Sequence, residues 1–123
     1  MGLASDIGRT KEQGLDVFRS IDLDETEEAV KTGQGIVYSI HASNSNASAR
    51  FLKLYDASVA DVVVGTTVPK QTFRIPGSGS IEVNPERGYG YATAITAAAT
   101  TGVADNDTGA PGANEVIVHI GYA

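Results

Sequence analysis

Hydrophobic and polar residues alternate along much of this chain, and short runs of Gly, Ser, Asn and Pro repeatedly interrupt the alternation. A period of two places successive side chains on opposite faces of a β-strand. The clearest alternating stretches are residues 37–55, 71–83 and 115–122. No stretch shows the period of an amphipathic helix over a comparable length. The pattern therefore predicts an all-β fold.

The first predicted strand covers residues 15–23. The side chains expected to share its buried face are Leu15, Val17, Ile21 and Leu23. Phe18 falls on the opposite, polar face. Residues 26–32 are compatible with a short strand or with one helical turn.

The next two strands are predicted to form a hairpin. In residues 36–42 the positions expected to share one face are Ile36, Tyr38, Ile40 and Ala42. A run of small turn-forming residues, 43–48, leads into a strand at residues 49–56. Residues 57–70 are irregular, and their Val62-Val63-Val64 run is expected to be a buried crossing segment.

Residues 89–101 are ambiguous between helix and strand. Their alanines favour a helix, but the β-branched Thr and Ile residues and two tyrosines favour a strand. We predict a strand with a surface of small residues that lets another backbone approach closely. A last strand covers residues 115–122, in which Val116, Val118, Ile120 and Tyr122 face one way and Ile117 and His119 face the other. The chain is thus expected to form a single-domain antiparallel β-sandwich, jelly-roll or Ig-like, of seven or eight short strands over residues 15–123. Residues 1–14 lack a consistent apolar period and are predicted to be an extended N-terminal arm.

The charge of the chain argues against two classes of partner. The formal net charge is −6, and no cluster of Lys or Arg is present to neutralise phosphates, so neither nucleic acid nor an anionic membrane surface is an expected partner. Five acidic residues fall within seven positions: Asp22, Asp24, Glu25, Glu27 and Glu28. This cluster is interpreted as a solvated strand end and turn, or as a patch that meets a basic partner.

The sequence predicts no enzyme, no cofactor and no metal centre. Neither a nucleophilic serine motif nor a phosphate-binding glycine loop is present. His41 and His119 lie on the polar side of their strands and would approach each other if those strands were neighbours, but two histidines without cysteine make a poor zinc site. Residues 105–109 begin like a calcium loop, which needs an oxygen ligand at its fifth position, glycine at its sixth and glutamate at its twelfth. Here those positions hold Gly109, Ala110 and Val116. A solvated loop or a partial cation site are the two interpretations.

Several strand and turn patterns that occur together in this chain carry a resemblance to a known group of proteins. They are Gly35 to Ala42 followed by an Asn/Ser-rich turn, Arg50 to Asp56, Gly65 to Pro69, Phe73 to Pro76, Arg87 to Gly90 before an Ala/Thr-rich strand, and Val116 to Tyr122. In these the chain resembles small β-sandwich structural proteins of tailed bacteriophages, several of which are capsid decoration (cement) proteins. The resemblance covers roughly residues 18–122 and omits the arm.

The resemblance implies a non-enzymatic protein that binds the outer shell of the major capsid protein and stabilises it. Such a protein is a homo-oligomer, a trimer or dimer, that assembles in the host cytoplasm and ends on the capsid exterior of the virion. The arm then contributes capsid-binding residues, for which Ile7, Arg9 and Lys11 are the candidates. Tyr89 and Tyr91, which are expected to point outward, and Thr93 are candidate subunit contacts. The alternative places the Ala/Thr-rich strand inside the core of the monomer. The alternative function is a carbohydrate-binding or host-adhesion module of a head fibre or tail tip.

Overall fold

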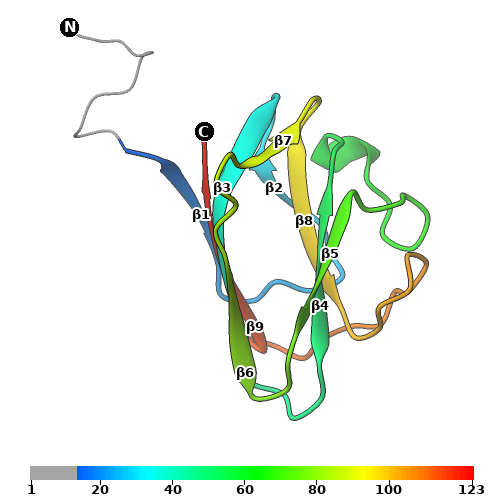
Figure 1. The fold of residues 1–123 in the computed structure, drawn as a ribbon. Helices are drawn as coiled ribbons and strands as arrows, with labels where there is room; N and C mark the ends of the chain where they lie inside the picture. The colour runs from blue at the N-terminus through cyan, green and yellow to red at the C-terminus, as the bar shows by residue number, and fades with distance from the viewer. Residues whose placement is uncertain (1–13) are drawn as a thin grey trace, which may run out of the picture.

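Two antiparallel sheets face each other across a hydrophobic core in the computed structural model, which describes residues 14–123 (Figure 1). Sheet I has the strand order β1 (Asp16–Ser20), β9 (Val116–Tyr122), β3 (Gly35–Asn44), β6 (Gly79–Val83), and β7 (Tyr89–Tyr91) pairs with the start of β3. Sheet II has the order β2 (Glu28–Lys31), β8 (Ile95–Thr100), β4 (Arg50–Tyr55), β5 (Gln71–Ile75). A 3-10 turn, Val59–Asp61, lies between β4 and β5. The predicted antiparallel β-sandwich is confirmed.

The described residues form nine strands rather than the seven or eight predicted. Residues 89–101 account for part of the difference, because they form two strands, β7 in sheet I and β8 in sheet II. Residues 26–32 contribute a strand, β2, and not a helical turn.

The predicted hairpin of β3 and β4 is wrong. The two strands belong to different sheets, so the small-residue run between them carries the chain across the sandwich. Asn44, only 3% exposed, holds this crossing: its Nδ2 donates to the Ser48 carbonyl at 2.9 Å and its Oδ1 accepts from the Asn46 N–H at 2.9 Å. Alternation defines which residues form strands, but it does not define which strands pair.

Two predicted strand faces are also wrong. In β3 the pairing with β9 shifts register between Val37 and Ser39, which turns Val37 inward and removes Ile36 and Tyr38 from the core face. Such a bulge inserts one residue and reverses the facing of those beyond it. In β1, Phe18 packs against the core while Val17 is 65% exposed.

Strand β8 is buried on both faces. Ala97 and Ala99 belong to the main core, and Ala98 packs with Tyr55 and Val62 in a second cluster on the other side of sheet II. The interpretation that the Ala/Thr-rich strand lies in the monomer's own core is therefore confirmed. The segment that contains Val62 covers sheet II but does not cross between sheets, because it joins the neighbouring strands β4 and β5.

One ion pair ties the two sheets together at the end of the sandwich. Arg50, the first residue of β4, donates from Nε to Glu115 Oε1 at 2.7 Å, just before β9. Asn46 Nδ2 donates to the second carboxylate oxygen at 3.0 Å. Burial alone raises the pKa of Glu115, but the hydrogen bonds from Arg50, Asn46 and the backbone outweigh burial and hold this pKa below its ordinary value.

The lowered pKa of Glu115 predicts an acid-dependent loss of stability. A carboxyl group whose pKa is depressed in the folded state contributes stability above its unfolded pKa and loses it as the pH falls through the folded pKa. We expect Glu115→Gln to lower the free energy of unfolding by about 1–3 kcal/mol at pH 7, and we expect this difference to shrink between pH 5 and pH 3. Urea denaturation at each pH measures it. Glu86→Gln, at an exposed turn residue, is the control; parallel pH profiles for the Glu115 variant and the wild type would refute the assignment.

Candidate functional site

The residues proposed for capsid and subunit contacts fall into two groups. Ile7, Arg9 and Lys11 lie outside the described residues. Tyr89, Tyr91 and Thr93 lie at one end of the sandwich, around β7 and the turn that leads to β8. Whether any of the six contacts another protein stays a prediction.

The expectation that Tyr91 points outward is wrong. Its side chain is 2% exposed, its hydroxyl donates to Gln71 Oε1, and the Lys70 ammonium lies 4.9 Å from its ring centroid. Burial, chiefly, raises the pKa of Tyr91 far above its ordinary value. Tyr89 is partly buried and packs against the core, with its ring centroid 6.3 Å from that of Phe73. Tyr91 is therefore a core residue that closes the end of the sandwich.

Thr93 is exposed on a turn that a single carboxylate holds. Asp56, at the end of β4, accepts hydrogen bonds from three consecutive backbone N–H groups, those of Ala92, Thr93 and Ala94. Burial raises the pKa of Asp56, but these three bonds and the charge of Lys70 outweigh it and give a net lowering. The turn thus presents Thr93 from a fixed backbone.

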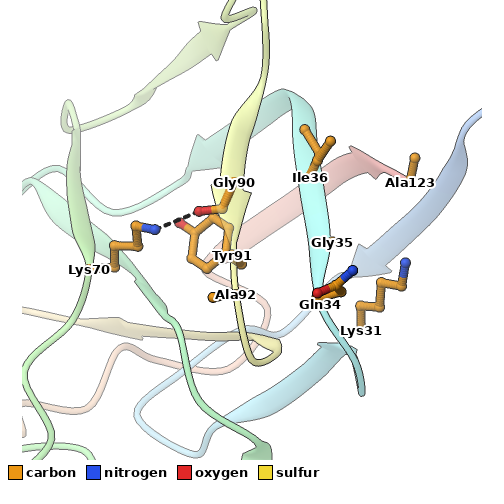
Figure 2. Close-up of a pocket in the computed structure, with 9 residues that line it drawn as sticks. All are labelled: Lys31, Gln34, Gly35, Ile36, Lys70, Gly90, Tyr91, Ala92 and Ala123. Atoms are coloured by element: carbon orange, nitrogen blue, oxygen red, sulfur yellow. Dashed lines mark hydrogen bonds between the residues drawn. The ribbon is translucent and has the colours of Figure 1, made fainter.

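Two open grooves lie at opposite ends of the sandwich. The first, of about 520 Å³, is lined by Lys31, Gln34, Gly35, Ile36, Lys70, Gly90, Tyr91, Ala92 and Ala123 (Figure 2). Figure 2 shows Lys31 and Lys70 on opposite sides of this groove. Lys70 already donates to the Gly90 carbonyl and lies 3.9 Å from Asp56, so its charge is largely engaged within the protein.

The second groove, of about 400 Å³, is lined by hydroxyl, amide and carboxylate side chains and one apolar residue. Its lining residues are Ser43, Asn44, Ser45, Ser78, Gly79, Ser80, Asn114, Glu115 and Ile117. The Asn44 amide and the Glu115 carboxylate are engaged in the crossing and the ion pair described above. The Ser45 hydroxyl donates to the Glu115 carbonyl at 3.5 Å. The groups that this groove offers to a ligand are the hydroxyls of Ser43, Ser78 and Ser80 and the side-chain amide of Asn114.

His41 and His119 are directly opposite each other on β3 and β9, with ring centroids 6.2 Å apart. The expectation that they approach if their strands are neighbours is confirmed. The register extends this pair into a row across the outer face of sheet I: Arg19, His119, His41 and Glu82. Within residues 14–123, no three His, Cys, Asp or Glu side chains are grouped as a metal site.

The loop at residues 105–109 is organised by the protein's own lysine. Lys53, 0% exposed, donates from Nζ to the Ala104 carbonyl at 2.5 Å. Burial lowers the pKa of Lys53, and the charges of Asp107 and Asp105 partly oppose this lowering. Asp107 Oδ1 also accepts from the N–H groups of Gly102 and Gly109. This loop is therefore held by an internal ammonium group and by the Asp107 carboxylate, and the partial cation site stays a prediction.

Exposed apolar side chains gather along β1, where the sequence predicted a buried face. Leu15, Val17 and Ile21 are 42%, 65% and 47% exposed. The sequence contained the signal, since these residues do alternate, but the alternation alone does not show which side of the strand the core occupies. This exposed apolar surface is the feature of the candidate site that the sequence interpretation missed.

Two comparisons with known proteins found no match. The sequence matches no protein-family model and no curated protein. Among residues 14–123, no helix has the length and apolar character required to cross a membrane. The fold and its surfaces define a single-domain antiparallel β-sandwich protein with an apolar surface along one edge strand.

Proposed function

We propose that this protein is a non-enzymatic structural component of a tailed-phage virion, a capsid decoration (cement) protein that binds and stabilises the shell of major capsid protein. The proposal combines two supports. One is the resemblance of its strand and turn patterns to such proteins. The other is the sandwich itself, in which buried strands and cross-sheet ties provide a rigid body that carries an adhesive surface.

A single observation carries the proposal: the exposed apolar residues at the start of β1. Leu15 and Val17 are exposed at the point where residues 1–13 join the sandwich. Exposed apolar residues that cluster on a small protein mark a contact with another macromolecule. The predicted arm residues Ile7, Arg9 and Lys11 would extend this contact along the shell.

The proposed role places many copies on one lattice. Each contact can then be modest, because attachment through several subunits of a trimer or dimer multiplies the effective affinity. The partner is the major capsid protein, and the location is the capsid exterior after assembly in the host cytoplasm.

Cosedimentation with expanded empty capsids tests the proposal. The capsids should be assembled from the major capsid protein encoded in the same genome as this chain. We expect the purified protein to pellet with the capsids in a saturable manner and to raise the capsid melting temperature in differential scanning calorimetry. Failure to cosediment, with the protein folded by circular dichroism, would contradict the proposal.

A second candidate, carbohydrate binding in a head fibre or tail tip, is favoured by the serine-rich groove. Convergent polar groups in a hollow are what a sugar ligand needs for orientation. The lining of this groove includes no aromatic ring to stack on a sugar face, which makes this candidate the weaker one. A glycan array distinguishes the two: specific glycan binding without capsid binding would favour the second.

A further inference from the structure

The exposed apolar residues of β1 belong to a larger continuous face of sheet I. Of six large hydrophobic residues that are exposed among residues 14–123, three lie in or beside β1, and the other three, Val63, Val68 and Val103, lie in the connections after β4 and β8. We call the surface the β1 face and define it by its residues: Leu15, Val17, Arg19 and Ile21, with Ile117 and His119 of β9 and His41 of β3.

The register shows that these residues share the outer side of the sheet. On β9 the alternate residues Val116, Val118 and Ile120 are in the core, so Ile117 and His119 face outward. Val17 is paired with Gly121 and Arg19 with His119. The Leu15 side chain reaches over the same strand, because a Cβ at Gly121 would lie 3.4 Å from Leu15 Cδ1.

The residues that define this face include one arginine and no carboxylate, although the whole chain is acidic. The net charge is −6, yet β3 and β9 contain no Asp or Glu, and their outward positions beside β1 carry two histidines next to Arg19. Along β1, Asp16 lies on the same side of the strand as Phe18 and on the opposite side from Arg19. Carboxylates occur at the borders, with Glu82 opposite His41 and Asp22 accepting from the Asn114 N–H. The centre of the face is therefore apolar and polar without a carboxylate, and Arg19 is its one formal positive charge.

The proposed contact of the N-terminal segment with the capsid shell links this face to the same partner. Residues 1–13 are joined to the described chain at Gly14, next to Leu15 of the face. A partner that holds this segment therefore also meets Leu15 and Val17. Charge complementarity then requires carboxylates opposite Arg19.

We propose that the β1 face is the surface that docks on the capsid shell, and that the shell presents there an apolar protein surface bordered by carboxylates. This inference rests on the proposed function and adds to it the face used and the chemistry of the partner. Burial of the three aliphatic side chains supplies affinity, and Arg19 supplies a salt-dependent contribution to docking.

A polar triple variant with a matched control tests the docking face. The test variant combines Leu15→Gln, Val17→Thr and Ile21→Thr; the control combines Val63→Thr, Val68→Thr and Val103→Thr at residues that are 58%, 69% and 62% exposed. Both variants change three exposed apolar residues, so both should keep the wild-type circular dichroism and melting temperature. In cosedimentation with empty capsids we expect the test variant to bind about tenfold more weakly or worse and the control to bind as the wild type does.

A charge reversal provides an independent variant. We expect Arg19→Glu to weaken capsid binding at low salt, with the difference from wild type shrinking as salt increases. Arg87→Glu, at an exposed residue in the turn before β7, is its control and should have a smaller effect.

The outcomes separate this inference from the proposed function. If the wild type does not bind capsids, the proposed function fails and this inference fails with it. If the wild type binds and the β1-face variants bind equally well, the function stands and the docking face is wrong. If the β1-face variants instead dissociate a homo-oligomer in light scattering, with capsid affinity per subunit unchanged, the face is a subunit interface and the inference is also wrong.

Discussion

Replacing Lys53 with alanine is expected to lower the free energy of unfolding by about 2–5 kcal/mol, as truncations of large buried side chains do. Lys53 is fully buried in β4, between β5 and β8 in sheet II, and its register partners are Thr72 and Ala98. Its aliphatic stem fills the space beneath the loop that follows β8, and its ammonium donates to the Ala104 carbonyl. The alanine variant leaves a cavity, removes one of the two hydrogen bonds that the Ala104 carbonyl accepts, and leaves Asp105 and Asp107 without the nearby ammonium charge.

Lys53→Met is the matched control, because methionine keeps most of the volume and removes the charge. Methionine loses the hydrogen bond from the ammonium group to the Ala104 carbonyl, at a cost of about 1.5–3 kcal/mol, while that carbonyl keeps the hydrogen bond from the Asp107 N–H at 3.0 Å. This cost is reduced because the folded state no longer has to desolvate an ammonium group. Urea denaturation followed by circular dichroism measures both variants. Equal losses for the two variants would show that the charge and not the packing dominates, contrary to this expectation.

Gly77→Ala is expected to destabilise the protein by about 1–3 kcal/mol, the usual cost of forcing atoms into a closed space. Gly77 lies in the connection between β5 and β6, which crosses from sheet II to sheet I. A Cβ on Gly77 would lie 1.9 Å from the Ala47 carbonyl oxygen and 2.6 Å from its carbon. Because both obstructing atoms belong to backbone, one of the two crossing segments must move, and the hydrogen bond from the Ser78 N–H to the Asn46 carbonyl moves with it.

Gly33→Ala is the control for this substitution. Neither glycine has a positive φ, and a Cβ on Gly33 meets nothing within 4 Å. We expect the control to change the free energy of unfolding by no more than about 0.5 kcal/mol. Thermal unfolding followed by circular dichroism compares the two variants under one condition. Similar melting temperatures for both would mean that the two crossings are not held together as tightly as the structure indicates.

Part of the candidate functional surface could be predicted from the sequence. The polar-side positions of His41 and His119 followed from alternation alone, and their approach depended only on β3 and β9 being neighbours. The sequence analysis also grouped the apolar residues of β1 on one face, but it predicted that face to be buried, whereas it is exposed. Alternation assigns Leu15 and Val17 to one side of a strand and Phe18 to the other, and either side can be the buried one until the opposing sheet is placed.

Other features of the structure had no local signal in the sequence. Lys53 alternates with Leu52 and Leu54 and so belongs to the side of β4 that faces away from the main core. It is buried because loops distant in the sequence cover that side of the sheet. The hydrophobic pattern within β4 carries no information about those loops. Tyr91 was expected outside for the related reason that residues 89–101 were treated as one strand, whereas the turn that Asp56 holds directs β7 and β8 into different sheets.

The sequence by itself determined that this chain is an antiparallel β-sandwich, because side-chain alternation and turn residues are local properties that select strand over helix. It also located most strands and the inward residues Val116, Val118 and Ile120 of β9. Only the tertiary structure decided which strands pair, which side of β1 and β3 is buried, and that Lys53 and Tyr91 are inside. Those features depend on contacts between segments far apart in the chain, where a single bulge or a covering loop reverses what the local pattern favours.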